Sequence, residues 1–264
     1  MKLAIAGSSG KMGRMVIEAA LAAGDVTIAA ALERPDAAQI GEDCASFLGR
    51  TSGVVITSDV AALAQADVLI DFTRPEGTLR HLAVCVEHRV RAVIGTTGFD
   101  EAGRRHIEQA ARNVPVVFSP NMSVGVNVSF RLVELAARML SGDFDVEIVE
   151  AHHRQKVDAP SGTALRLGEL VASALGRSLP EVALHSRHGL TGARPPGSIG
   201  FSVIRGGDMV GEHSVLFVGD GERVEITHRA FSRMTYALGS LRAARFLAQR
   251  APGLYDMRDV LGLG

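Results

Sequence analysis

The first half of the chain alternates short apolar runs with helical patterns, and this alternation limits the fold more than any other feature. Lys2 to Ala6 is an apolar run, and 12–23 then places apolar residues at helical spacing. The apolar runs are continuous, which is typical of a parallel sheet covered on both faces. We therefore expect an α/β fold with a Rossmann-like doubly wound parallel sheet. Further strands are expected at 26–32, 68–72, 92–94 and 114–118, and helices at 60–66, 77–88 and 101–112.

Composition and charge narrow the class of protein. The 264 residues are 47% hydrophobic, enough to bury one large core or two moderate ones. A formal net charge of −1 gives no uniformly basic face, so we expect no nucleic-acid partner. Cys44 and Cys85 are isolated, which favours free thiols and a cytoplasmic location. We expect no membrane partner, because no apolar run approaches the roughly 18 residues that a span needs.

A glycine-rich turn, Gly7-Ser8-Ser9-Gly10-Lys11-Met12-Gly13, follows the first strand. Its spacing is one residue longer than the usual dinucleotide fingerprint, so a tight turn without a ligand is the alternative. A helix follows the turn, and the glycines would let backbone N–H groups at the start of this helix approach a pyrophosphate. Glu33 ends the second strand, where an acid binds ribose hydroxyls, and Arg34 beside it can pair with a 2′-phosphate. The pair suggests that NADH and NADPH are both accepted.

Polar stretches follow three more strands of the first half, at 71–77, 95–98 and 119–122. In a doubly wound sheet, ligands bind outside the carboxyl ends of the strands. We therefore expect these stretches to line one edge together with the glycine turn.

The second half predicts a different sheet. After an amphipathic helix at 126–140, strands are expected at 145–150, 200–205, 214–218 and 223–228, the last two joined by a hairpin turn. Turns rather than helices join the last three strands, which indicates a mixed or antiparallel sheet with a helix on one face.

A last helical pattern at 236–249 is expected to pack on the first domain, with hinges near Asn121 and Arg233. The second domain is then an insertion. We predict a dinucleotide-binding domain of 1–122 plus 233–264 and a substrate-binding domain of 123–232, whose open sheet face would suit oligomerisation; the family resemblance described below implies that this second domain is also the tetramerisation domain.

The segment 150–164 carries the most chemistry, and it is expected on the loop between a strand and a helix. His152 and His153 can exchange protons near neutrality, and Lys156 adds a positive charge. Ser161-Gly162-Thr163, at a helix start, offers donors to a carboxylate. The segment therefore predicts a site that binds and protonates a small anion.

Two alternatives compete for the histidine pair: a metal site and a surface pair without function. Adjacent residues on a strand point to opposite faces, and no third ligand lies close in sequence, so a metal is disfavoured. Arg233 could clamp a carboxylate or be an ordinary loop arginine. His228, within a strand pattern, is expected to be structural.

Over nearly its full length the chain resembles the dihydrodipicolinate reductase family. The resemblance rests on Gly7 to Gly13, Asp71 to Pro75, Gly95 to Phe99, Asn121 to Asn127 and, above all, Glu150 to His153 with Lys156 to Ala164. It implies NAD(P)H-dependent reduction of 4-hydroxy-tetrahydrodipicolinate (dihydrodipicolinate) to tetrahydrodipicolinate, in the diaminopimelate route to lysine. Hydride would pass from nicotinamide C4 to ring C4, followed by protonation, in a homotetramer.

The resemblance also implies residue roles, with no metal. His152 would be the proton donor or acceptor, and Lys156 a proton donor. The dicarboxylate would be bound by His153, Lys156, Ser161, Gly162, Thr163 and Arg233. NADH or NADPH would be held by Gly7, Ser8, Ser9, Gly10, Lys11, Met12, Glu33, Arg34, Gly95, Thr96, Thr97, Ser119, Pro120, Asn121 and Met122.

Two other functions are weighed against this one. Another amino-acid-pathway dehydrogenase, such as an aspartate dehydrogenase, would not need the pattern from Lys156 to Thr163. A non-catalytic nucleotide-sensing module would bind dinucleotides without turnover and would give that segment no purpose.

Overall fold

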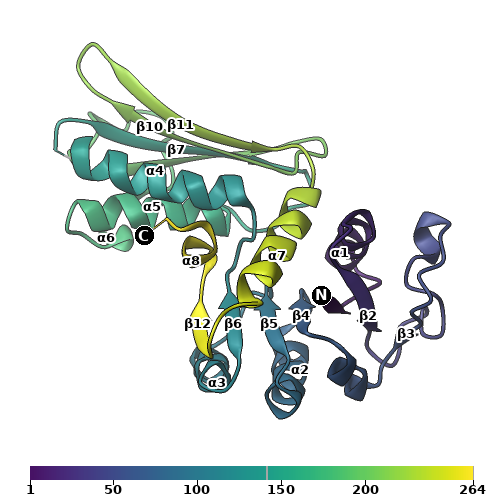
Figure 1. Ribbon diagram of the computed structural model, residues 1–264. Coiled ribbons are helices and arrows are strands. Elements are labelled where there is room, and N and C mark those ends of the chain that lie inside the picture. Colours follow the sequence, from purple (N-terminus) through teal and green to yellow (C-terminus); the bar gives the residue numbers. More distant parts are fainter. Residues whose placement is uncertain (141, 264) are drawn as a thin grey trace. The chain divides into compact units, whose positions relative to one another are not determined.

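The computed structural model describes residues 1–140 and 142–263, and the chain forms two compact units (Figure 1). Unit 1 comprises Met1–Val124 and Arg233–Gly264, and unit 2 comprises Gly125–Ser232. The predicted boundary assigned residues 123 and 124 to the second domain, whereas they belong to unit 1. A hydrogen bond from the Ser123 N–H to Asn121 Oδ1 (2.9 Å) closes the turn that follows β6.

Unit 1 is built, within the described residues, on a seven-stranded parallel sheet of order β12-β6-β5-β4-β1-β2-β3. Its strands are β1 (Lys2–Ala6), β2 (Thr27–Leu32), β3 (Ile56–Thr57), β4 (Val68–Asp71), β5 (Arg91–Ile94), β6 (Pro115–Phe118) and β12 (Gly253–Tyr255). Its helices are α1 (Lys11–Ala22), α2 (Pro75–His88), α3 (Glu101–Ala111), α7 (Met234–Leu247) and α8 (Met257–Leu261), with 3-10 turns η1 (Ser46–Leu48) and η2 (Val60–Gln65).

Helices cover both faces of this sheet, as the continuous apolar strands predicted. Leu3 and Ile5 of β1 belong to one buried cluster, with residues of α1 and α7. Ala4 and Ala6 belong to a second cluster, with residues of α2 and α3. Successive side chains of a strand point to opposite faces, so one strand contributes to both clusters. The doubly wound α/β fold is confirmed.

Short elements of unit 1 escaped the sequence patterns. The expected helix at 60–66 is the 3-10 turn η2, and neither β3 nor β12 was predicted. Two or three residues are too few to show a period, and these strands exist because β2 and β6 offer them a partner edge. Leu241 of α7 is buried in the first cluster and Phe246 packs against it, so the last long helix belongs to unit 1.

Unit 2 contains, among the residues described, a mixed sheet of order β11-β10-β7-β9-β8. β10 pairs antiparallel with β7 and β11, whereas β9 pairs parallel with β7 and β8, so the predicted mixed sheet is confirmed. The strands are β7 (Asp145–His152), β8 (Ala183–Leu184), β9 (Ile199–Arg205), β10 (Gly211–Val218) and β11 (Arg223–Ala230). The helices are α4 (Val124–Leu140), α5 (Gly162–Ala174) and α6 (Leu179–Val182).

The core of unit 2 lies between its sheet and its two long helices, which run along one sheet face in Figure 1. Val133 of α4 and Leu167 of α5 are buried with Ile148 of β7 and Phe217 of β10. Both helices therefore pack on the same face of the sheet. Glu150 and His152, described below, lie at the carboxyl end of the central strand β7.

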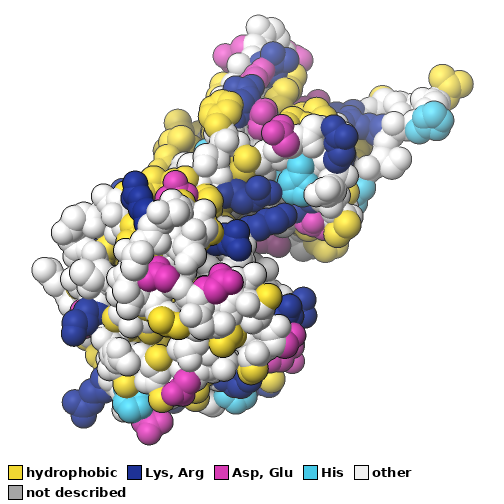
Figure 2. All heavy atoms as spheres, turned by 90° about the vertical axis from the view of Figure 1, so that its right-hand side faces the viewer, with side chains coloured by type: hydrophobic (Ala, Val, Ile, Leu, Met, Phe, Trp, Pro, Cys, Tyr) yellow, Lys and Arg dark blue, Asp and Glu magenta, His cyan; other side chains and the backbone are white. Residues whose placement is uncertain are grey.

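Other expectations from composition concern the surface and the thiols. Acidic and basic side chains both occur on the face shown in Figure 2, in keeping with the net charge of −1. Cys44 and Cys85 are free and buried, as predicted. In 1–140 and 142–263, no helix has the length and apolar character of a membrane span.

Candidate active site

Four turns of unit 1 come together because their strands are neighbours. The sheet order β6-β5-β4-β1 places 119–122, 95–98, 71–77 and 7–13 at the carboxyl ends of four adjacent parallel strands. Parallel strands end on the same sheet edge, so the polar turns share one side of the unit. This is the edge at which the sequence placed the dinucleotide.

The glycine turn allows a backbone approach that larger residues would block. Gly7 has a φ of +71°, and a Cβ on Gly13 would lie 2.0 Å from the Gly7 carbonyl oxygen. Among the described residues, no side chain caps the start of α1 at Gly10. The first N–H groups of α1 are therefore open to an anionic ligand, which fits a pyrophosphate.

A cavity of about 450 Å³ lies beside this turn. Within unit 1 the Glu33 carboxylate is held by Ser9, whose N–H and Oγ–H donate to Glu33 Oε1 at 3.0 and 2.7 Å. The guanidinium of Arg34 pairs with Asp36, with Nε 3.2 Å from Oδ1. The cavity is lined by residues that include Gly7, Glu33, Arg34, Thr73, Arg80 and His81.

A buried carboxylate that sequence reasoning did not assign, Asp71, organises the turns after β4 and β5. Its Oδ1 accepts from Thr73 N (2.9 Å) and from the hydroxyls of Thr73 (2.7 Å), Thr78 (3.1 Å) and Thr96 (3.2 Å), and its Oδ2 lies 2.8 Å from His81 Nδ1. Burial would raise the pKa of Asp71, but the His81 and Thr73 contacts outweigh it and lower that pKa. The signal was an aspartate directly after an apolar strand.

Met122 lies differently from the other predicted cofactor residues. Its side chain is 1% exposed and belongs to the core cluster that contains Leu241. A Cβ on Gly239 would lie 1.8 Å from the Met122 carbonyl oxygen, so α7 packs directly against this turn. The cofactor contact predicted for Met122 stays a prediction, because the side chain fills the core and the carbonyl oxygen faces α7.

The segment 150–164 of unit 2 begins on a strand, which corrects its expected placement on a loop. β7 extends to His152, because Ala151 pairs with Glu212 of β10 and His152 with Arg205 of β9. The loop starts only at His153. Strand pairing fixes the backbone of His152 more firmly than a loop could.

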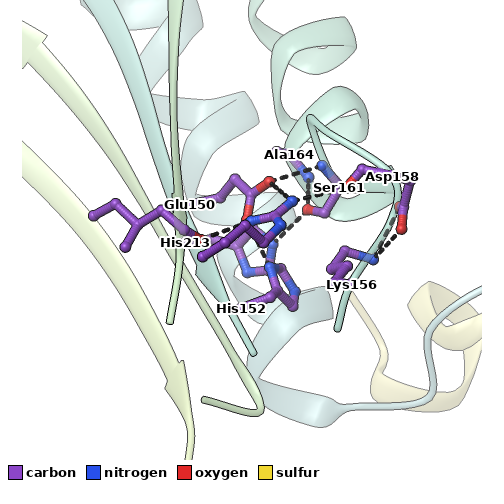
Figure 3. A network of polar contacts seen from close by, with 9 residues as sticks. Glu150, His152, Lys156, Asp158, Ser161, Ala164 and His213 are labelled. Carbon is purple, nitrogen blue, oxygen red and sulfur yellow. Dashed lines mark hydrogen bonds and ion pairs between the residues drawn. The ribbon is translucent and has the colours of Figure 1, made fainter. Parts of the chain in front are cut away.

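Register across three strands assembles the polar cluster drawn in Figure 3. Glu150 and His152 are two residues apart on β7 and therefore share a face. His213 of β10 pairs in register with Glu150, and Arg205 of β9 pairs with His152. The sequence alone could have indicated Glu150 through its two-residue spacing from His152. Arg205 and His213 could be placed in the cluster only from the strand register.

Glu150 is the centre of the cluster, with its side chain 1% exposed. Its Oε2 lies 2.6 Å from His152 Nδ1, and both its oxygens accept from Arg205, each at 2.7 Å. The Ser161 N–H donates to Oε1 at 3.0 Å. Burial alone would raise the pKa of Glu150, but the hydrogen bonds from Arg205, His152 and Ser161 hold it below its ordinary value. Glu150 is therefore an ionised acceptor.

The carboxylate fixes the tautomer of His152. We assign the proton of the neutral ring to Nδ1, since an ionised carboxylate only accepts. Nε2 then remains for proton exchange, with no hydrogen-bond partner in the described part of the chain. A Cβ on Gly211 would lie 3.0 Å from this atom, so the glycine leaves it room. Burial, together with the positive charges of Lys156 and Arg205, outweighs the raising effect of Glu150 and lowers the pKa of His152, so the ring is mainly neutral at pH 7.

Ser161 and His213 join this cluster to the start of α5. Ser161 caps the helix, accepting from the Ala164 N–H at 3.2 Å, and its Oγ lies 2.9 Å from His213 Nε2. The His213 ring also meets the His152 ring edge-on, with centroids 5.1 Å apart. Burial lowers the pKa of His213 to about 3, which keeps this ring neutral. The helix N-terminus is thus held next to His152.

Lys156 and His153 lie on the loop between β7 and α5. Lys156 Nζ donates to both Asp158 oxygens, at 2.8 and 2.9 Å, and this bond lowers the pKa of Asp158. The Asp158 carbonyl in turn accepts from Arg205 at 2.7 Å. His153 donates its N–H to Met209 (2.8 Å), and its buried Nδ1 has no partner among the described residues.

The structure thus brings most of the predicted substrate residues into one loop and one helix start of unit 2. Gly162 and Thr163 follow Ser161 in the first turn of α5. Arg233 is the exception, because it lies in unit 1, immediately before α7. Its role as a carboxylate clamp stays a prediction. Of the residues described, no three His, Cys, Asp or Glu side chains gather as a metal would need.

Comparison with known proteins gives consistent results along the whole chain. The 4-hydroxy-tetrahydrodipicolinate reductase of Herminiimonas arsenicoxydans is 60% identical over 264 residues, which is 100% of this chain and 98% of the relative. A dipicolinate-bound dihydrodipicolinate reductase from Paenisporosarcina sp. TG-14 has the same fold, with a TM-score of 0.78, 24% identity and 98% of each chain covered.

The alternative of an aspartate dehydrogenase is not favoured. Such an enzyme from Thermotoga maritima shares the fold, with a TM-score of 0.50 and 16% identity, covering 95% of this chain and 98% of its own. By contrast, the family model for the N-terminus of dihydrodipicolinate reductase matches residues 1–122, and the one for its C-terminus matches 125–261. Together with the full-length relative, these matches establish that the chain belongs to the dihydrodipicolinate reductase family.

Proposed function

We propose that this chain reduces 4-hydroxy-tetrahydrodipicolinate to tetrahydrodipicolinate with NADH or NADPH, in the diaminopimelate route to lysine. The observation that carries the proposal is the hydrogen bond between Glu150 and His152 beside the N-terminus of α5. It joins a proton-exchanging ring to a helix start that suits a carboxylate. A dicarboxylate that must gain a proton needs both groups.

The cofactor would be held by unit 1. The pyrophosphate would lie against 7–13, where the turn needs glycine and α1 has uncapped N–H groups. Glu33 and Arg34 would face the ribose, since both line the adjoining cavity. The edge would be completed by Gly95 to Thr97 and by Ser119 to Asn121. The hydrogen bond from the Thr96 hydroxyl to Asp71 holds the first of these two turns in place. The reduced nicotinamide supplies the hydride that reaches ring C4 of the substrate.

His152 would move the proton at its Nε2 atom. A neutral ring with its proton on Nδ1 accepts at Nε2, and the imidazolium that forms is stabilised by Glu150, 2.6 Å from Nδ1. The carboxylate thus orients the ring and balances its charge, while Arg205 keeps the carboxylate ionised. Proton transfer by a positioned group of this kind contributes on the order of 10²–10⁴-fold in rate.

Lys156 would act as a proton donor and as a positive charge for the substrate. Its ammonium now binds Asp158, so substrate carboxylates would share or replace that partner. Ser161, Gly162 and Thr163 would hold a carboxylate at the start of α5, with His153 on the same loop. The final proton would come from the ammonium of Lys156, or from the imidazolium of His152 after Nε2 has taken a proton from solvent.

A coupled assay tests the function directly. Aspartate semialdehyde and pyruvate are mixed with the preceding synthase, and the absorbance of NADH or NADPH is followed at 340 nm. Addition of this protein should oxidise the cofactor at a rate proportional to protein concentration. If neither cofactor is consumed, the proposed function is wrong.

The assembly and location are also part of the proposal. The outward apolar residues of unit 2, such as Val203, Ile204 and Val224, are 38–50% exposed and suit contact with other copies in a homotetramer. Light scattering should give four times the chain mass of 27.9 kDa. We propose a cytoplasmic location without nucleic-acid or membrane partners, which fits two unpaired thiols.

A further inference from the structure

We propose that Ser9 shifts the cofactor preference of this chain toward NADH by fixing the carboxylate of Glu33. The inference rests on the proposed function, because it assigns Glu33 to the cofactor ribose. Ser9 belongs to the glycine turn, and the contact that matters here is made by its side-chain hydroxyl with the Glu33 carboxylate. Ser9 and Glu33 are 24 residues apart and meet only because β1 and β2 are neighbours.

Ser9 holds one oxygen of Glu33 with two hydrogen bonds. Its Oγ–H donates to Oε1 at 2.7 Å and its N–H donates to the same atom at 3.0 Å. The Arg34 N–H donates to Oε2 at 3.1 Å. Three donors therefore fix the carboxylate, and one of the three depends on the Ser9 side chain. Both residues are partly buried, which limits competition from water.

A carboxylate fixed in this way distinguishes between the two cofactors. The ribose of NADH carries a 2′-hydroxyl, which can donate to Glu33, whereas the 2′-phosphate of NADPH is an anion that Glu33 repels. NADPH therefore requires the carboxylate to turn away, and the Ser9 hydroxyl opposes that movement. Arg34, the cation beside it, is bound to Asp36 (3.2 Å) and so is partly neutralised.

Loss of the Ser9 hydroxyl should act oppositely on the two cofactors. Ser9→Ala keeps the backbone donor but frees the carboxylate to move, so NADH loses a positioned acceptor and NADPH meets less repulsion. The net contribution of one typical hydrogen bond supports a change of the Kd ratio of about 3- to 10-fold toward NADPH. A role of Ser9 in turn stability alone would weaken both cofactors equally.

The experiment measures Kd for NADH and NADPH on the full chain by isothermal titration calorimetry, without substrate. Ser9→Thr retains the hydroxyl and should keep the Kd ratio within twofold of the unmodified chain. Ser46→Ala is a control in unit 1, since Ser46 is exposed and lies outside both the glycine turn and the residues that line the cavity. Its Kd ratio should also stay within twofold.

The outcomes separate this inference from the proposed function. A ratio that moves at least threefold toward NADPH in Ser9→Ala, and not in the other two variants, supports the inference. A smaller movement, a movement toward NADH, or an equal movement in either Ser9→Thr or Ser46→Ala overturns it while leaving the proposed function intact. If the unmodified chain binds neither cofactor with a Kd below 1 mM, both proposals fail.

Discussion

Replacing Glu150 by glutamine should disable His152 while leaving the sheet in place. Four donors converge on the two Glu150 oxygens: one from His152, two from Arg205 and the Ser161 N–H. Glutamine offers one acceptor oxygen and an NH₂ group that faces donors. The amide therefore cannot satisfy the set, and His152 loses both its fixed tautomer and the charge that stabilises its imidazolium.

The size of the effect follows from these contacts. Loss of a positioned proton-transfer group should lower kcat by about 10²–10³-fold. Since Glu150 raises the pKa of His152 by hydrogen bond and charge, its neutralisation lowers that pKa further. The limb of the pH–rate profile set by His152 should therefore move to lower pH. The guanidinium of Arg205, 19% exposed, loses its partner, which should cost about 3 kcal/mol in the free energy of unfolding.

The assay follows cofactor oxidation at 340 nm between pH 5.5 and 9, with urea denaturation for stability. Glu147→Gln is the matched control, because Glu147 lies on the same strand and pairs with Arg187 and Arg194 but touches no histidine. It should keep kcat within twofold. A folded Glu150→Gln protein with kcat within threefold of the unmodified chain, and an unmoved pH profile, would refute the reasoning.

Three further predictions concern the turn, the ring and the pH dependence of stability. Gly13→Ala should weaken NADH binding at least tenfold by calorimetry, because the new Cβ would lie 2.0 Å from the Gly7 carbonyl oxygen. Gly24→Ala is the control, because a Cβ there meets open space; equal Kd values for the two variants would contradict the prediction. His152→Gln should lower kcat by about 10²–10⁴-fold with little change in KM for the cofactor, and near-normal kcat would exclude its role. The pKa of His213, lowered to about 3 by burial, means that only the unfolded chain binds that proton between pH 6.5 and 3. The free energy of unfolding should therefore decrease as the pH is lowered through this range, by up to about 1.4 kcal/mol per pH unit. His213→Leu should flatten this slope in urea titrations while His188→Leu, at an exposed position, should not; identical slopes would show that His213 is not the cause.

Several parts of the site were readable from the chain alone because they depend on local order. A glycine turn between a strand and a helix, and an acid at the end of the next strand, are defined by short stretches of sequence. The segment from Glu150 to Ala164 likewise carries its histidines, lysine and helix start in contiguous residues. The one local error was the end of β7, since pairing with β9 and β10 carried the strand through His152.

Other contacts join residues far apart in sequence, and no local pattern records them. Arg205 reaches Glu150 across 55 residues, and His213 reaches Ser161 across 52. Asp71 gathers threonines from two turns, and Ser9 meets Glu33 only because two strands are neighbours.

The sequence by itself determined the doubly wound fold, and it predicted the cofactor edge and the proton-handling segment. These follow from periodicity and from residue types at fixed spacing, which the chain carries locally. Only the tertiary structure decided which atom of His152 is left for chemistry. That choice depends on Glu150 being buried, ionised and held by Arg205, and burial and register are set by the pairing of distant strands.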